Sequence, residues 1–183
     1  MKLSRNFKTA SLALAVLWIV FLANYLLPVD LRLYGIRPRR IDGLSGILFS
    51  PFLHVNLRHL IANSFALFFL LFLSLSLDKK MTGLALVIII LLGGGGVWLF
   101  GRPHTVHIGA SGVIFGLLGF MLFAGIFQRR WKALFFSLAV FLLYGGLLLT
   151  LLVQRPGVSW TGHFFGFLAG VAAAWATRST KHR

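Results

Sequence analysis

A single serine lies among small residues at the start of a long apolar run. The stretch HIGASGVIFGLLGF, residues 107–120, surrounds Ser111 with glycines and an alanine and contains no acidic residue. A serine in a small-residue motif of a membrane helix commonly serves close helix packing. The same serine becomes a nucleophile where a neighbouring base takes its proton. Ser111 can therefore have either a packing role or a catalytic role.

The candidate base lies in the stretch GHFFGFLAG, residues 162–170. Neutral histidine is the usual general base at pH 7. On helices, both stretches place small residues along one stripe, which lets two backbones approach closely. If the stripes pack against each other, Ser111 and His163 come within hydrogen-bond reach, since both lie near the outer ends of their helices. The stripes contain His163, Gly166 and Gly170 in the later stretch, and Gly112, Gly116 and Gly119 in the earlier one.

A third stretch, HVNLRHLIAN at residues 54–63, places two further polar side chains at the start of an apolar run. His59 and Asn63 are four residues apart, so a helix puts them on one face. Such a pair can join two helices through a hydrogen bond or take part in function. We expect His54 and Arg58 to lie at the outer surface, as residues of the membrane interface.

Cleavage of an amide needs hydrogen-bond donors directed at the developing oxyanion. The Asn63 amide, a ring N–H of His59 and the backbone N–H of Ser111 can each donate, and the last also gains from the dipole of the helix that it begins. Gly109 and Ala110 leave room for a peptide backbone beside the serine. Because no apolar run contains an acidic residue, serine chemistry here would use a Ser–His dyad without the usual carboxylate.

A histidine-bound metal is the rival chemistry. The chain has no cysteine and no H-E-x-x-H motif, so we expect neither a metal site nor a cofactor. His104 and His107 are expected in an outer loop. The glycines at 93–96 favour close helix packing or a local helix distortion, because no Lys-Ser/Thr follows them as in a phosphate loop. The histidines that a metal would use are His54, His59, His104, His107 and His163.

The chain of 183 residues is 58% hydrophobic and 11% charged, with a mean hydropathy of +0.91. These values indicate an integral membrane protein, since a soluble domain needs more polar surface. A membrane-crossing helix requires about 20 apolar residues. We therefore predict an all-α polytopic protein, with a single domain over residues 1–183 and six transmembrane helices. The six runs are Thr9–Leu27, Leu57–Leu77, Thr82–Phe100, Ser111–Phe127, Ala133–Val153 and Trp160–Thr177.

The net charge is +15, and the basic residues lie at the ends of the apolar runs. Lipid headgroups and topology explain this distribution more simply than nucleic acid. With both termini cytoplasmic, cytoplasmic segments hold 11 of the 18 lysines and arginines, as the positive-inside rule favours. The first run is too long for the apolar core of a signal peptide. In the first outer loop, LSGILFSPFLH at residues 44–54 is too short to span, which predicts an interfacial or re-entrant segment.

The combination of HVNLRHLIAN, GASG and GHFFGFLAG, on the second, fourth and sixth runs, resembles the rhomboid family of intramembrane serine proteases. The resemblance covers about residues 43–177 and implies a six-helix rhomboid-like bundle. It implies that Ser111 is the nucleophile and His163 the general base. The other residues to which it gives roles are His59, Asn63 and Gly109, at the oxyanion and substrate-binding site, and Gly166 and Gly170, which pack the sixth helix on the fourth.

Three features depart from the family pattern. Phe115 stands where the family often has a tyrosine beside the catalytic histidine, so it can stack on the imidazole but offers no hydroxyl. The segment LSGILFSPF lacks the Trp-Arg pair that many members carry in the first loop. Asp78, and not a glutamate, ends the second run. The last two differences concern loop packing and substrate handling and leave the dyad unchanged.

The resemblance implies a serine endopeptidase that cleaves membrane-spanning proteins near the outer side of the bilayer. The small size and the lack of large extra domains suggest the bacterial cytoplasmic membrane. The partners of such a protease would be transmembrane protein substrates and membrane lipids, with no nucleic acid. A substrate would carry a small residue at the cut and helix-weakening residues nearby, because a helix hides its carbonyl groups. The alternative is a catalytically inactive rhomboid-like module that binds membrane proteins, a class that usually lacks the serine or the histidine. A small transporter fits less well, because the runs lack an acidic relay.

Overall fold

The computed structural model describes residues 2–151 and 159–178, and these residues form an all-α fold. An isolated β-bridge between Ile36 and His107 joins two loops. The prediction of an all-α protein is confirmed. The helical elements are α1 (Lys2–Leu26), η1 (Leu31–Tyr34), η2 (Ile41–Gly43), α2 (Gly46–Phe49), η3 (Ser50–Phe52), α3 (Leu57–Leu77), α4 (Lys79–Ile88), η4 (Ile89–Gly93), α5 (Gly94–Phe100), α6 (Ser111–Gln128), α7 (Trp131–Tyr144), η5 (Gly145–Leu151) and α8 (Trp160–Ala176).

Among the described residues, five helical segments are long and apolar enough to cross a membrane, so the chain is an integral multi-pass membrane protein. The first begins earlier than predicted, because α1 continues through the basic stretch before Thr9. The end predicted for the fifth run, Val153, lies outside the described residues. α8 corresponds to the sixth run; its 17 residues give a length of about 25 Å, and six crossings stay a prediction. The five segments are Leu3–Leu26, Leu57–Leu77, Lys79–Phe100, Ser111–Gln128 and Trp131–Leu151.

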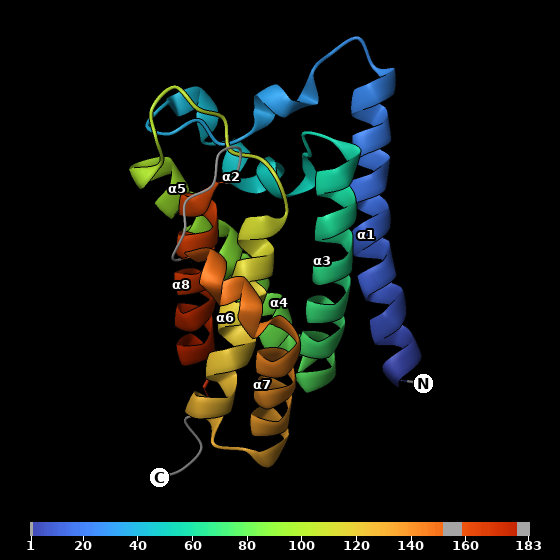
Figure 1. Cartoon of the computed structure of the whole chain (residues 1–183), viewed down its shortest axis with the longest axis vertical. Coiled ribbons are helices and arrows are strands. Elements are labelled where there is room, and N and C mark those ends of the chain that lie inside the picture. Colours follow the sequence, from blue (N-terminus) through green and yellow to red (C-terminus); the bar gives the residue numbers. More distant parts are fainter. Residues whose placement is uncertain (1, 152–158, 179–183) are drawn as a thin grey trace.

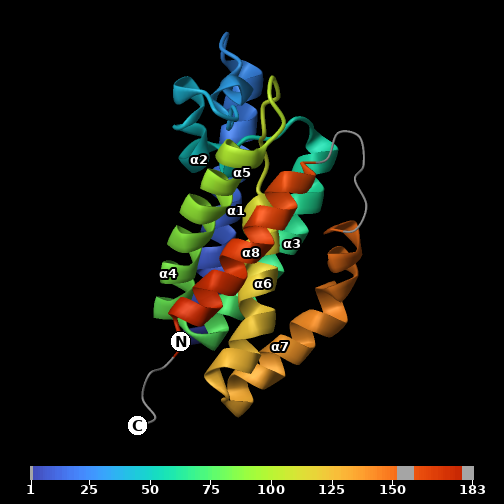
Figure 2. The same cartoon turned by 90° about the vertical axis from the view of Figure 1, so that its left-hand side faces the viewer.

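The long helices form one bundle with α6 at its centre (Figures 1 and 2). α6 packs most extensively on α8 and next on α7, while α1 lies at one side against α3. In the most apolar stretch of α6, 61% of the residues are buried, against 6% in the segment formed by α7 and η5. The beginning of α1 and the end of α8 lie at the same end of the bundle in both views.

Glycines let α6 and α8 meet backbone to backbone. A Cβ added to Gly166 would strike the carbonyl oxygen of Gly112, and one added to Gly170 would strike that of Gly116. Gly116 also contacts Ile89 of η4. Such contacts let two helices approach more closely than larger side chains allow. We call Gly112, Gly116, Gly166 and Gly170 the glycine interface.

The third long helix changes its winding between α4 and α5, where Ile89–Gly93 form a π-helical turn. A Cβ added to Gly93 would lie 3.3 Å from the Cα of Gly166, and one added to Gly94 would lie 2.8 Å from Cγ2 of Ile47. The glycine run therefore combines a local distortion with close packing, the two interpretations that its sequence favoured. Turns of this kind are frequent at functional sites.

Short helical turns cover the end of the bundle at which α6 begins. The segment at 44–54 forms α2 and η3, and α2 lies against α5 and η4 (Figure 1). The indole N–H of Trp98 donates to the Arg40 carbonyl oxygen at 2.8 Å. A side-chain hydrogen bond from Arg40, with a second from Arg37, lowers the pKa of Asp42. These contacts hold the first loop over the helix ends, with Arg37 and Arg40 in ion pairs with Asp42.

Candidate active site

Ser111 is the first residue of α6, at the covered end of the bundle. Ala110 occupies the N-cap, and Gly109 before it has a φ of +115°, a conformation that glycine adopts much more readily than other residues. The Gly109 N–H donates to the Ser50 carbonyl oxygen at 2.9 Å. A glycine turn tied to the first loop therefore leads directly into the serine.

His163 lies in the first turn of α8 and is 8% exposed. Its imidazole stacks on Phe115 of α6, with ring centroids 4.1 Å apart and planes at 13°. Nδ1 of His163 is buried and has no hydrogen-bond partner in the described part of the chain. The phenyl ring, rather than a hydrogen-bonded carboxylate, holds the orientation of this imidazole, which is the stacking role that the position of Phe115 suggested.

The glycine interface brings together the two helices that carry Ser111 and His163. Phe115 is one turn after Ser111 on α6, so the ring that supports His163 shares a face with the serine. Within residues 2–151 and 159–178, no hydrogen bond joins Ser111 to His163. In enzymes without bound substrate, hydrogen bonds between catalytic groups are often long and tighten when substrate binds.

His59 and Asn63 of α3 face the glycine turn. A Cβ added to Gly109 would lie 2.7 Å from Cε1 of His59 and 3.6 Å from Nδ2 of Asn63. Asn56 caps α3 by accepting the backbone N–H of His59 at 2.9 Å, which anchors the first turn of the helix. The structure therefore brings two polar side chains of α3 to the turn that precedes Ser111.

His54 is a buried residue of this site, and the prediction that it lies at the outer surface is wrong. It is 2% exposed, whereas Arg58 is exposed as expected. Nδ2 of Asn63 donates to Nε2 of His54 at 3.0 Å, and Nδ1 of His54 lies 3.4 Å from the Phe52 carbonyl oxygen. An amide nitrogen only donates, so His54 carries its hydrogen on Nδ1. Burial, reinforced by nearby His59, lowers the pKa of His54 to about 4, which keeps the ring neutral at pH 7.

His107 also belongs to this end of the bundle. It lies in the loop between α5 and α6, as expected, and its backbone pairs with that of Ile36. Its ring is held at both nitrogens, with Nδ1 2.7 Å from Oγ of Ser159 and Nε2 2.9 Å from Oγ1 of Thr105. Burial lowers the pKa of this imidazole. By contrast, His104 in the same loop is exposed.

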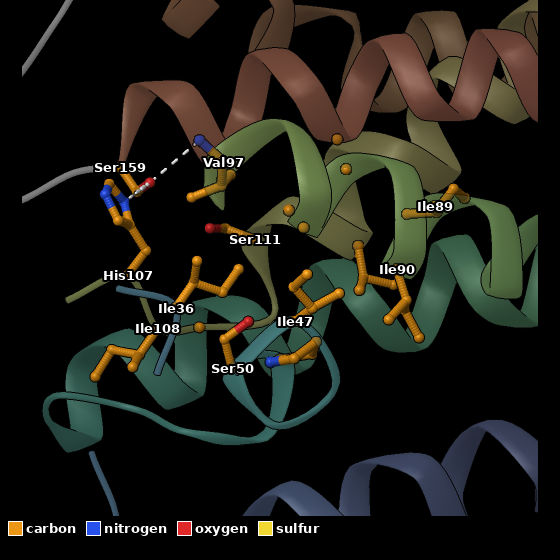
Figure 3. A pocket seen from close by; sticks show the side chains of 18 residues that line it. Ile36, Ile47, Ser50, Ile89, Ile90, Val97, His107, Ile108, Ser111 and Ser159 are labelled. Carbon is orange, nitrogen blue, oxygen red and sulfur yellow. Dashed lines mark hydrogen bonds between the residues drawn. The ribbon is translucent and has the colours of Figure 1, made fainter. Parts of the chain in front are cut away.

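A pocket lies beside Ser111, between the first loop, the π turn and α8 (Figure 3). Its cavity volume is about 50 Å³, which is room for a few water molecules. Its wall includes polar residues from two helical elements, Ser50 of η3 and Ser111 of α6, and from two loop positions, His107 and Ser159. The labelled apolar side chains that line it are Ile36, Ile47, Ile89, Ile90, Val97 and Ile108.

These features define a class of protein: helical, multi-pass membrane proteins that carry a serine and a histidine on two closely packed helices, near one end of the bundle. The Rhomboid domain family model matches residues 42–180 of this chain. The chain belongs to the rhomboid family, and this membership suggests an intramembrane protease.

Three relatives illustrate the range of similarity. The chain is 44% identical to an uncharacterized protein of Mycobacterium tuberculosis over 169 residues, which cover 88% of this chain and 70% of the relative. It is 32% identical to a putative rhomboid protein of Acanthamoeba polyphaga mimivirus, covering 67% of this chain and 69% of the relative. It is 28% identical to a putative rhomboid protease of Bacillus subtilis, with 72% and 66% covered.

Proposed function

We propose that the chain is an intramembrane serine endopeptidase in which Ser111 is the nucleophile and His163 the general base. The contact between α6 and α8 carries the proposal, because it stacks His163 on Phe115, one turn from Ser111. A neutral imidazole would take the hydroxyl proton as Oγ attacks the scissile carbonyl carbon. The same ring would then give that proton to the leaving amine, and a water molecule would release the acyl group by the reverse steps.

The oxyanion would form beside Gly109, where His59 and Asn63 meet the turn. The Asn63 amide has two hydrogens; His54 accepts one, which leaves the other for the substrate. The backbone N–H of Ser111 adds a donor at the N-terminus of α6, where the helix dipole favours negative charge. Gly109 would serve this site because it has no side chain, since a Cβ there would lie 2.7 Å from Cε1 of His59 and would displace that ring from the turn.

We propose transmembrane protein segments as the substrates, cut near the outer side of the bilayer. Ser111 begins its helix, so water and an unwound substrate segment would reach it without entering the middle of the membrane. The location proposed for the protein is the bacterial cytoplasmic membrane. From the distribution of basic residues we propose that both termini lie in the cytoplasm.

The protein would consist of one rhomboid-like domain over residues 1–183, with its core at about 43–177. It would work among membrane lipids and without a cofactor.

Cleavage of a single-span reporter protein in lipid vesicles tests the proposal. We expect wild type to release a defined fragment and to react with a fluorophosphonate probe, and both Ser111→Ala and His163→Ala to fall to background in both assays. Ser45→Ala, at an exposed serine of the first loop, is the matched control and should behave as wild type. Equal cleavage by Ser111→Ala would exclude the serine mechanism. A folded wild type that neither cleaves nor labels would favour the membrane-protein binding module.

A further inference from the structure

We propose that His107 is a positioning residue that sets the distance between Ser111 and His163. Its imidazole joins the segment before Ser111 to Ser159, the N-cap residue of the helix that carries His163. The role deepens the proposed function and rests on it, because His163 is taken as the base. His107 precedes Ser111 by four residues, and Ser159 precedes His163 by four residues. One side-chain contact thus connects the two backbone segments that carry the candidate dyad.

The hydrogens of this link can be assigned one by one. The Thr105 hydroxyl donates to the Arg102 carbonyl oxygen at 2.6 Å, so its oxygen accepts from Nε2–H of His107 at 2.9 Å. Nδ1 of His107 then carries no hydrogen and accepts from the Ser159 hydroxyl at 2.7 Å. The contacts therefore assign the neutral Nε2–H tautomer to His107. In this tautomer each hydroxyl and each ring nitrogen has a partner of the correct kind.

Ser159 transmits the contact to α8. Its Oγ accepts the backbone N–H of Gly162 at 3.1 Å, and its carbonyl oxygen accepts the backbone N–H of His163, also at 3.1 Å. A capping side chain fixes the first turn of a helix, and His163 belongs to that turn. Any displacement of Ser159 relative to His107 therefore moves the imidazole of His163 relative to Ser111.

The other end of the link is anchored to the first loop. Ile36 and His107 exchange two backbone hydrogen bonds, at 3.0 and 2.9 Å, and the Gly109 N–H donates to Ser50. Figure 3 shows His107 beside Ser159 at one end of the pocket that Ser111 lines. Because both ring nitrogens are occupied, His107 is not free to take the Ser111 proton itself, and its part is to hold α8 against the loop.

Three substitutions of His107 separate its two side-chain contacts, the one with Ser159 and the one with Thr105. Asparagine puts an amide oxygen close to the place of Nδ1, where it can accept from Ser159. Glutamine reaches the place of Nε2 and retains only the Thr105 contact, while leucine loses both. We expect His107→Asn to label Ser111 with a fluorophosphonate at a rate within about threefold of wild type. His107→Gln and His107→Leu should label more slowly by about ten- to a hundredfold, since a shift of about 1 Å can cost a hundredfold in rate.

The matched control is His104→Asn, at the exposed histidine of the same loop, which should label as wild type. Thermal unfolding of each variant separates positioning from folding, because a purely structural role would lower stability in all three His107 variants without rescue by asparagine. Labelling that is equal in the asparagine, glutamine and leucine variants, or that ranks glutamine above asparagine, would overturn the positioning role.

Imidazole ¹⁵N NMR of the full chain in detergent micelles provides a readout that does not depend on cleavage. We expect His107 to show the neutral Nε2–H tautomer, and its Nδ1 signal to shift in Ser159→Ala. The opposite tautomer, or a Nδ1 signal that is unchanged in Ser159→Ala, would contradict the hydrogen bond between His107 and Ser159. If wild type failed to label at all, the proposed function and the positioning role would both fall, while the NMR result would still decide whether the link exists.

Discussion

The centre and the edge of this bundle are held together by different kinds of contact. α6 meets α8 through the glycine interface, where backbone atoms of one helix touch backbone atoms of the other. α7 follows α6 in the chain but turns large apolar side chains outward, among them Phe135, Leu138, Phe141, Leu142 and Leu143. Backbone contacts leave no flexible atom to move aside, whereas an outward leucine has many equivalent arrangements among lipid chains. Tolerance to substitution should therefore fall steeply from α7 to α6.

The largest expected effect comes from the glycine interface. In Gly170→Leu the new side chain would meet the Gly116 carbonyl oxygen and the Phe120 nitrogen, so the helices must separate. A shift of about 1 Å between nucleophile and base can lower the rate about a hundredfold. A side chain wedged between two backbones should exceed that shift, so we expect reporter cleavage and fluorophosphonate labelling both to fall to background. Gly95→Leu on α5 is the control, since a Cβ there meets nothing within 4 Å. Wild-type turnover of Gly170→Leu would show that backbone contact does not set the site.

A smaller effect is expected where a side chain, and not the backbone, is altered at the centre. Asn63→Ala removes one of several oxyanion donors, so kcat should fall by about 10²–10³ while fluorophosphonate labelling continues. Asn6→Ala is the matched control, because Asn6 is also a buried asparagine but bonds to Ser76 near the other end of the bundle. That control should alter thermal stability and leave kcat unchanged. Loss of labelling in a folded Asn63→Ala protein would instead make Asn63 part of the base machinery.

The buried pair of His54 and Asn63 connects the tightly packed centre of the bundle to the first loop. The pH dependence of stability tests whether the fold holds His54 neutral. The pKa of His54 is lowered to about 4, below the ordinary value of about 6.5 for an unfolded histidine. Between these two pH values the unfolded chain binds more protons than the folded chain. The stability that comes from burying neutral His54 is therefore complete above about pH 6.5 and is lost as the pH falls toward 4.

His54→Gln keeps an acceptor for Asn63 but does not titrate. Between pH 7 and pH 5, the thermal midpoint of wild type should therefore decrease more than that of His54→Gln. Equal decreases in the two proteins would mean that His54 is not held neutral by the fold. His104→Gln, at an exposed histidine, serves as the control and should follow wild type.

The smallest expected effect lies at the edge of the bundle. Leu142 on α7 is 73% exposed in the bundle, so Leu142→Ala should leave cleavage within about twofold and stability within about 0.5 kcal/mol. Leu118 on α6 is completely buried, and Leu118→Ala should cost about 2–5 kcal/mol in the free energy of unfolding. Equal losses for the two leucines would remove the contrast between centre and edge.

Much of the fold was predictable because its signals are local. The apolar runs located the long helices, and glycine spacing placed Gly166 and Gly170 on the face that meets α6. His54 could not be placed in the same way, since a polar residue just before an apolar run has the pattern of an interfacial residue. Its burial depends on η3, which brings it to Asn63. The contact of His107 with Ser159 likewise depends on the paths of two loops.

The π turn at Ile89–Gly93 also determines how the third long helix responds to a change in length. Each residue added to an α-helix rotates everything beyond it by about 100°, and a π turn accommodates its extra residue locally. α4 can therefore keep Thr82 bonded to Ser74 of α3 at 2.8 Å, while α5 independently directs Trp98 at the Arg40 carbonyl oxygen. Deleting one residue within the turn would therefore restore a uniform helix and leave Trp98 directed at the first loop, whereas a deletion in α5 before Trp98 would rotate it away by about 100°. The π turn thus lets α4 and α5 each keep the contacts of its own end of the bundle despite the extra residue between them.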